Sequence, residues 1–163
     1  MYVDNDLFLY ESDDQITVRC KLQFHKYEIQ IQMLPSEIEV VNNEKKNIIS
    51  VNSDSIIWIS TDQGPQARNV FNTSAEIYIK NGDQLIYLTH FAYGEAINDL
   101  RKTKTYALAE RIAQKMSDKY NIKWEYKYSI DTPQKDKRRS MGLLMIVLLW
   151  ILMIVVFLLT RKN

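Results

Sequence analysis

The sequence contains few glycines, cysteines and histidines, and each shortage excludes a class of site. Its four glycines lie far apart, which excludes nucleotide binding by a known glycine-rich loop. Cys20 is the single cysteine, so no internal disulfide can form, and this fits a reducing compartment. His25 and His90 are the only histidines, and no short ligand spacing around them predicts a zinc site. We therefore expect no metal and no cofactor.

Catalysis has no better support in the sequence. Cys20 alternates with polar neighbours in a way that points its thiol into a core, where cysteine is usually inert packing. Glu37 and Glu39 share one strand face, but such acids are usually solvated. We expect a protein that is not an enzyme, although an enzyme with an unrecognised site is kept as a third hypothesis.

What the sequence does have is a long apolar run near its end. Residues 141–159 are uncharged, and fourteen of them are Leu, Ile, Val or Phe. As a helix the run would be about 28 Å long, close to the roughly 30 Å of a bilayer core. Those fourteen side chains contribute on the order of −4 to −8 kcal/mol to insertion. The run predicts a single transmembrane helix, followed by a short tail at 160–163.

Charges on either side of the run predict its orientation. Residues 1–14 carry five acids and do not resemble a secretory signal. Four basic residues precede the run and two follow it, which points the amino-terminal domain toward the cytoplasm. In a bacterium the membrane would be the inner membrane. The six basic residues are Lys135, Lys137, Arg138 and Arg139 before the run, and Arg161 and Lys162 after it.

The net charge of +1 hides a division along the chain. Residues 1–100 contain fifteen acids against seven bases, a balance of −8, whereas residues 101–140 contain five against twelve, a balance of +7. The basic part adjoins the predicted membrane helix. It would be attracted to an anionic leaflet by about 1 kcal/mol per residue. The alternative is that the basic linker at 131–140 merely sets topology.

Alternating apolar residues predict several strands in the first half of the chain. Residues 15–24 and 27–33 alternate with period two and form a hairpin, ended by Pro35. Shorter strands are expected at 37–41, 48–51 and 56–60, separated by loops at 42–47 and 61–68.

The second half contains the strongest turn signal and then changes period. Strands at 75–80 and 84–90 flank Asn81-Gly82, a dipeptide that tolerates a tight hairpin turn. Helical spacing of apolar residues predicts a helix over about 105–119, with a start as early as residue 95 left open. Alternation over 122–130 then predicts one more strand.

These elements predict an α+β domain over residues 1–130. Many antiparallel strands before one amphipathic helix indicate a β-rich antiparallel curled sheet, or a small barrel, capped by that helix. The basic linker 131–140 then joins this domain to the predicted transmembrane helix.

Part of this pattern resembles a known family. The hairpin around Asn81-Gly82, the acidic start at Glu95 and the helical run at 107–113 are similar to the end of pleckstrin-homology-like domains in small bacterial membrane proteins. The resemblance covers about residues 75–120 and implies a module that binds proteins or lipids. Two features depart from the family pattern: a strand follows the helix, and a membrane anchor follows the domain.

One stripe of the predicted helix is basic. A basic stripe beside an apolar stripe is typical of a helix that lies on a membrane surface. We expect this stripe, together with the basic linker residues, to contact anionic lipid headgroups. The alternative is an ordinary helix with one edge in a core and the other in water. The basic residues of the helix are Lys104, Arg111, Lys115 and Lys119.

Mixed basic and aromatic residues at 123–128 are better explained by cross-strand packing than by nucleic-acid binding.

The predicted anchor has an unusual tryptophan near its centre, although tryptophan prefers the two membrane interfaces. Four residues would share one helix face, and we expect this ridge to pack against another transmembrane helix. The ridge consists of Ile146, Trp150, Ile154 and Phe157.

The sequence therefore predicts a single-pass, carboxyl-terminally anchored protein with a cytoplasmic binding domain. Its first hypothesis is a scaffold, adaptor or accessory subunit that binds other membrane proteins. Its second is recognition of anionic lipid headgroups by the basic residues named above. Its partners would be the lipid bilayer and membrane proteins, with no nucleic acid.

Overall fold

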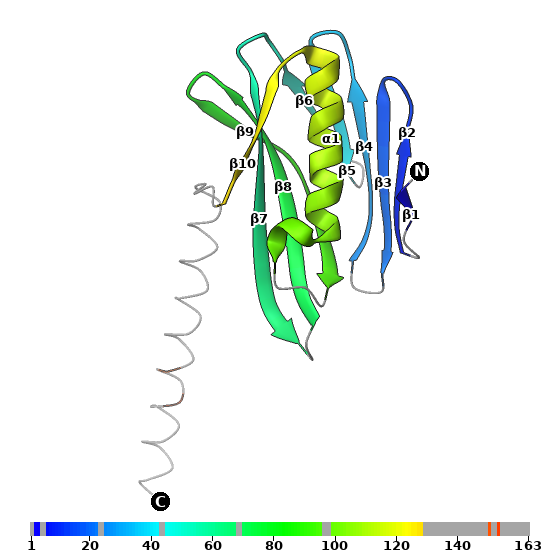
Figure 1. Cartoon of the computed structure of the whole chain (residues 1–163), viewed down its shortest axis with the longest axis vertical. Coiled ribbons are helices and arrows are strands. Elements are labelled where there is room, and N and C mark those ends of the chain that lie inside the picture. The colour runs from blue at the N-terminus through cyan, green and yellow to red at the C-terminus, as the bar shows by residue number, and fades with distance from the viewer. Residues whose placement is uncertain are drawn as a thin grey trace, which may run out of the picture. The chain divides into compact units, whose positions relative to one another are not determined.

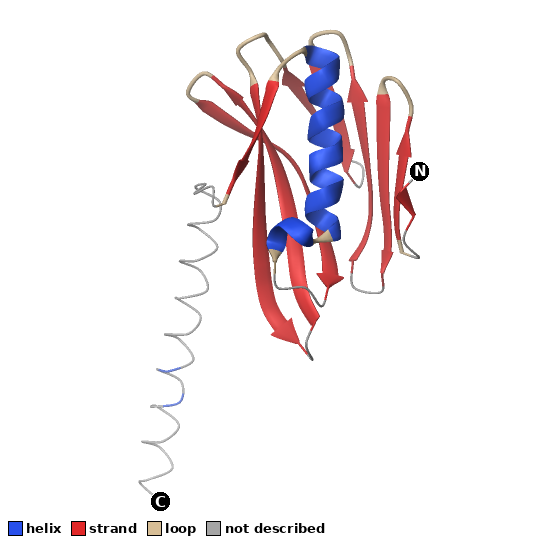
Figure 2. Ribbon diagram, viewed as in Figure 1, coloured by secondary structure: helices blue, strands red, loops and turns tan. Residues whose placement is uncertain are grey.

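The computed structural model describes residues 2–3, 6–22, 25–42, 45–67, 70–95 and 99–128, together with positions 150 and 153. The chain divides into two compact units, Met1–Ser129 and Ile130–Asn163. In its described residues the first unit contains two sheets, one α-helix and one short 3-10 helix (Figure 2). The predicted β-rich α+β class is confirmed.

The first sheet is a six-stranded meander in which each strand pairs with the next one along the chain, always antiparallel. Alternation decides which side chains are inside: Ile16, Val18 and Cys20 are at most 2% exposed, whereas the residues between them reach solvent. The strands are β1 (Tyr2–Val3), β2 (Leu7–Glu11), β3 (Gln15–Leu22), β4 (His25–Met33), β5 (Glu37–Asn42) and β6 (Lys45–Ser50).

The second sheet has four strands in the order β10-β7-β8-β9. The edge strand β10 runs parallel to β7, with Lys123 opposite Ile56. A parallel pair needs a crossover connection, and here the α-helix lies in that connection. The remaining pairs are antiparallel. The strands are β7 (Ile56–Ala67), β8 (Val70–Asn81), β9 (Gln84–Glu95) and β10 (Lys123–Lys127).

The helix α1 (Lys104–Tyr120) begins one residue before the predicted 105–119 and ends one residue after it. The hydroxyl of its N-cap residue, Thr103, accepts a hydrogen bond from the Tyr106 amide at 3.2 Å. At the other end Asn121 adopts a left-handed conformation, with φ of 54°, and its amide caps the carbonyl of Ser117. The short helix η1 (Leu100–Lys102) precedes it, so α1 does not extend back to residue 95.

α1 packs against the inner face of the second sheet and lies in front of both sheets (Figure 1). Its apolar stripe joins the inward side chains of both sheets in a single core. One polar contact also crosses between the sheets, because the Tyr27 hydroxyl of β4 donates to the carbonyl of Ala92 on β9 at 3.3 Å. The buried helix residues are Thr105, Tyr106, Leu108, Ala109, Ile112, Ala113 and Met116.

Several predictions about the strands need correction. In the described residues neither sheet closes on itself, so two open sheets take the place of the predicted small barrel. The expected loop at 61–68 is largely strand, because β7 continues to Ala67 through a register shift between Gln63 and Gln66. That irregularity accommodates Pro65, which has no amide hydrogen for the ladder. Residues 7–11, for which no strand is predicted from the sequence, form β2.

The hairpin between β8 and β9 is found, but its two central residues are Gly82 and Asp83 instead of Asn81 and Gly82. Asn81 pairs with Gln84 in the ladder. Gly82 has a φ of 57°, which a residue without a Cβ adopts at low cost. The predicted turn is therefore displaced by one residue.

The predicted membrane helix at 141–159 lies outside the described residues, apart from two positions. Trp150 and Met153 are helical and exposed, at 61% and 59%. Within the part of the chain that the structure describes, no helix is both long and apolar enough to span a bilayer.

Candidate functional site

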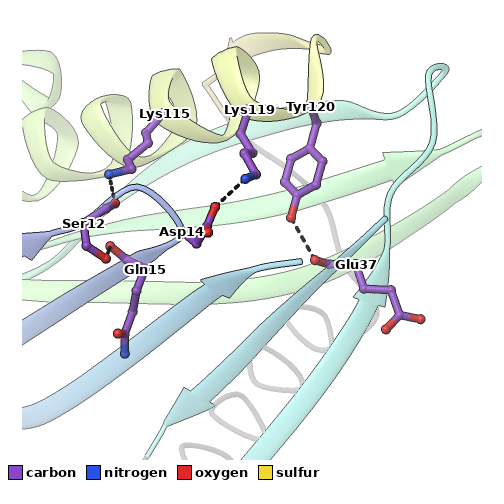
Figure 3. Close-up of polar contacts among 7 residues, drawn as sticks. All are labelled: Ser12, Asp14, Gln15, Glu37, Lys115, Lys119 and Tyr120. Carbon is purple, nitrogen blue, oxygen red and sulfur yellow. Dashed lines mark hydrogen bonds and ion pairs between the residues drawn. The ribbon is translucent and has the colours of Figure 1, made fainter. Parts of the chain in front are cut away.

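The basic stripe predicted for the helix is real, and most of it faces the turn between β2 and β3. Figure 3 shows Lys115 reaching the backbone carbonyl of Ser12, and Lys119 reaching the carboxylate of Asp14. The turn is itself closed by the Ser12 amide, which donates to the Gln15 carbonyl at 2.9 Å. These two lysines therefore bind the chain's own acidic turn.

Arg111 makes the most specific contact of the stripe. Its Nε lies 2.8 Å from Oε1 of Glu11, and its Nη2 lies 2.7 Å from Oε2, so the guanidinium holds the carboxylate with two parallel bonds. The hydrogen bond from Arg111 lowers the pKa of Glu11 below its ordinary value, against the opposing effect of burial. The charges of Arg111 and Lys115 act in the same direction.

Two further contacts fix the ends of α1. Lys104 places its ammonium group 5.1 Å from the ring centre of Tyr93 on β9. At the other end, the Tyr120 hydroxyl donates to the carbonyl of Glu37, the first residue of β5, at 2.8 Å (Figure 3). Burial, followed by the charge of Asp14, raises the pKa of Tyr120 to about 12, so this donor keeps its proton at neutral pH. The helix is thus held to both sheets.

The four cations predicted to contact lipid therefore all have partners within the domain. Arg111, Lys115 and Lys119 are brought together over the β2–β3 turn, whereas Lys104 lies apart over Tyr93. A lipid headgroup would have to compete with these partners. Contact with anionic lipid through this stripe stays a prediction, and the structure offers it no free cationic surface among the four.

A shallow open depression of about 730 Å³ covers the solvent side of α1. We call it the α1 face. It contains three acidic and two basic side chains, so its charges are mixed and nearly balanced. Six of its residues come from one side of the helix, one from the end of β2 and one from β10. They are Ala107, Glu110, Arg111, Gln114, Lys115 and Asp118 of α1, with Glu11 and Trp124.

A chain of hydrogen bonds orders one side of the α1 face. The indole Nε1 of Trp124 donates to Oε1 of Gln114 at 2.9 Å. Gln114 in turn donates from Nε2 to Oδ1 of Asp118 at 2.8 Å. Trp124 is half-buried, so its ring has a fixed orientation and still reaches solvent. Arg111, held by Glu11, is the second ordered side chain of the α1 face.

Of the residues in the α1 face, sequence reasoning predicted only Arg111 and Lys115 as site residues. The sequence predicts cross-strand packing for Trp124, and it assigns no contact to Glu11. The alternation in β10 does carry a signal, because Trp124 shares its strand face with the buried Ile122 and so points toward the core. No local pattern connects Glu11 with Arg111, since a hundred residues separate them.

The other predicted site residues lie outside the described part of the chain. These are the linker residues Lys135, Lys137, Arg138 and Arg139, and the ridge residues Ile146, Ile154 and Phe157. Trp150 is described, but its three predicted ridge neighbours are not. Among the described residues, no group of three or more His, Cys, Asp or Glu side chains is arranged to hold a metal ion.

No known protein family, curated protein or solved structure matches the chain. The resemblance of residues 75–120 to pleckstrin-homology-like domains therefore stays a prediction.

Proposed function

We propose that this chain is a single-pass membrane protein whose described domain binds another membrane protein as a scaffold, adaptor or accessory subunit. The observation that supports this function best is the α1 face, where the half-buried Trp124 and the exposed Arg111 are both held by hydrogen bonds. Tryptophan and arginine are the side chains most enriched among residues that dominate binding energy at protein interfaces.

Fixed side chains favour binding because they lose little entropy when a partner arrives. Ordering a mobile side chain at an interface costs about 0.5–1.5 kcal/mol. Trp124 and Arg111 are already restrained by Gln114 and Glu11, so most of that cost is met within the free domain. The mixed charge of the face suits a partner segment that carries both signs, and it does not suit a purely anionic surface.

The apolar run at 141–159 gives such a face its location. The ten linker residues 131–140 span at most about 33–36 Å when extended. A domain on so short a tether meets the membrane proteins around it at a high effective concentration. A modest affinity at the α1 face would then be enough for stable association.

Site-specific crosslinking tests this function directly. A photoreactive amino acid is placed at Ala107, which is exposed within the α1 face, and in a second sample at Gln30, which is exposed on the first sheet. The chains are expressed in native membranes and irradiated before solubilisation. We expect a crosslinked membrane protein from position 107, and a much weaker product or none from position 30.

A matched pair of substitutions completes the test. Trp124→Ala should abolish the crosslink from position 107, because it removes the ordered aromatic ring. Lys46→Ala on β6, whose ion pair with Glu39 lies away from the α1 face, should leave it unchanged. Equal crosslinking from both positions, or equal loss with both substitutions, would show that the α1 face is not the partner surface.

A further inference from the structure

A second ordered surface lies on the opposite face of the second sheet. In β10 and β7, the paired residues Trp124 and Ile57 point toward α1, so the paired residues Glu125 and Trp58 point away from it. Three lysines surround this outward pair. We call this surface the Trp58 patch; it consists of Trp58, Lys80, Lys123, Glu125 and Lys127.

Two of the lysines bracket the indole ring. The Nζ atom of Lys80 on β8 lies 5.1 Å from the ring centre of Trp58, and that of Lys127 on β10 lies 5.0 Å from it. Both ammonium groups thus lie over the ring in cation–π contact. The aromatic ring and the two cations therefore form one continuous surface.

The patch is positively charged overall. Glu125 is its only acid and is bonded to Lys127 at 2.7 Å. That bond lowers the pKa of Glu125, and the charges of Lys123 and Lys80 lower it further, so all three lysines lie near this carboxylate. Three lysines against one glutamate leave the patch with a charge of +2.

Trp58 also has an unmet hydrogen-bond donor. Its Nε1 atom is buried and has no partner among the described residues. Tryptophan usually finds an acceptor for this group, and at membrane interfaces it combines a buried ring with a polar tip.

The patch is also the part of the domain from which the chain continues toward the predicted anchor. Lys127 ends β10, and only thirteen residues, 128–140, separate it from residue 141. Fully extended, they span about 43–47 Å. Four of them are the basic linker residues already predicted to lie near an anionic leaflet.

We propose that the Trp58 patch rests on the anionic surface of the bilayer into which residues 141–159 insert. The lysines contact lipid phosphates and the indole ring lies at the interface. This inference depends on the membrane tether of the proposed function. It also orients the domain: because the patch and the α1 face lie on opposite sides of the second sheet, the α1 face is directed away from the lipid and toward a partner.

Fluorescence of Trp58 in a reconstituted bilayer tests the contact. The full chain, with Trp124→Phe and Trp150→Phe so that Trp58 is the only tryptophan, is inserted into nanodiscs of phosphatidylcholine with or without phosphatidylserine. Lipid brominated in the upper acyl chain quenches an indole at the interface, whereas acrylamide quenches one in water. With phosphatidylserine present we expect quenching by the brominated lipid and protection from acrylamide.

Charge reversal separates the patch from other basic residues. Removing the attraction of one lysine to an anionic surface lowers the fraction of domains in contact with the lipid about fivefold. Lys80→Glu with Lys127→Glu should therefore abolish quenching by brominated lipid, as should salt at about 0.5 M, which screens surface charge. Lys45→Glu with Lys46→Glu, an equal charge change on β6, should leave it intact.

The outcomes distinguish the contact from the tether. If the chain enters the nanodiscs but Trp58 remains open to acrylamide and unaffected by phosphatidylserine, the contact is refuted and the tether stands. If charge reversal at Lys80 and Lys127 leaves lipid quenching unchanged, the contact is equally refuted. If the chain does not enter nanodiscs, the tether fails and the contact fails with it.

Discussion

Arg111 in α1 holds Glu11 at the end of β2 through two hydrogen bonds of 2.8 and 2.7 Å, across a hundred residues of sequence. This pair joins the helix to the outer part of the first sheet. It also fixes the arginine within the α1 face, so it connects the stability of the domain with the surface that we propose for a partner.

A double-mutant cycle measures this pair. Surface ion pairs usually contribute about 0.2–1 kcal/mol, and the two-bond geometry places this one toward the upper end. We expect Glu11→Gln and Arg111→Ala to be each modestly destabilising, with a coupling energy of about 0.5–1 kcal/mol in urea unfolding of the full chain in detergent. Strictly additive effects would mean that the two side chains are independent in solution.

The same coupling should depend on pH. The pKa of Glu11 in the folded domain is below its ordinary value of 4.5, so the folded state binds this proton less tightly than the unfolded state. Its contribution to stability is therefore complete above about pH 4.5 and is lost as the pH falls through the lower folded-state value. The cycle should give a smaller coupling at about pH 3 than at about pH 7. A coupling that does not change over this interval would contradict the ionic origin of the pair.

Gly82 allows a different test, because the effect of replacing this residue depends on backbone conformation alone. Its φ is 57°, and a Cβ placed there would meet no atom within 4 Å. Gly82→Ala should therefore cost only the left-handed strain of about 1–2 kcal/mol. Asp83→Ala in the same turn should cost much less. If the two substitutions have equal effects on the urea midpoint, Gly82 does not hold this conformation in solution.

The predicted anchor provides a test outside the described domain. If Ile146, Trp150, Ile154 and Phe157 form a packing ridge, Trp150→Leu should weaken recovery of the neighbouring membrane protein after solubilisation in detergent. Val155→Leu, a similarly apolar change at a position that the ridge does not include, is the control. Unchanged recovery with Trp150→Leu would show that the ridge does not bind another helix.

Local pattern was enough to predict much of the domain. The alternation of Ile16, Val18 and Cys20 identified the buried side of β3 correctly, and helical spacing located α1 to within one residue at each end. These features depend on which face of an element is apolar, and that information is contained in neighbouring residues.

The remaining features depend on residues that are distant in sequence. No local signal predicts that β10 pairs in parallel with β7, because the paired residues Lys123 and Ile56 are far apart in the sequence. Gly64-Pro65 looked like a loop, yet a register shift lets β7 continue past it. The helix cations looked available for lipid until tertiary structure brought Glu11, Ser12 and Asp14 to them.

The proposed function depends first on where the domain is held, and membrane fractionation tests this most directly. Sealed cells that express the full chain are treated with external protease, lysed and centrifuged, and the membranes are washed with alkaline carbonate. We expect the chain to stay in the washed membranes with its domain intact, and a variant without residues 141–159 to be soluble. Recovery of the full chain in the supernatant, or digestion of its domain by the external protease, would contradict a cytoplasmic domain tethered to the membrane.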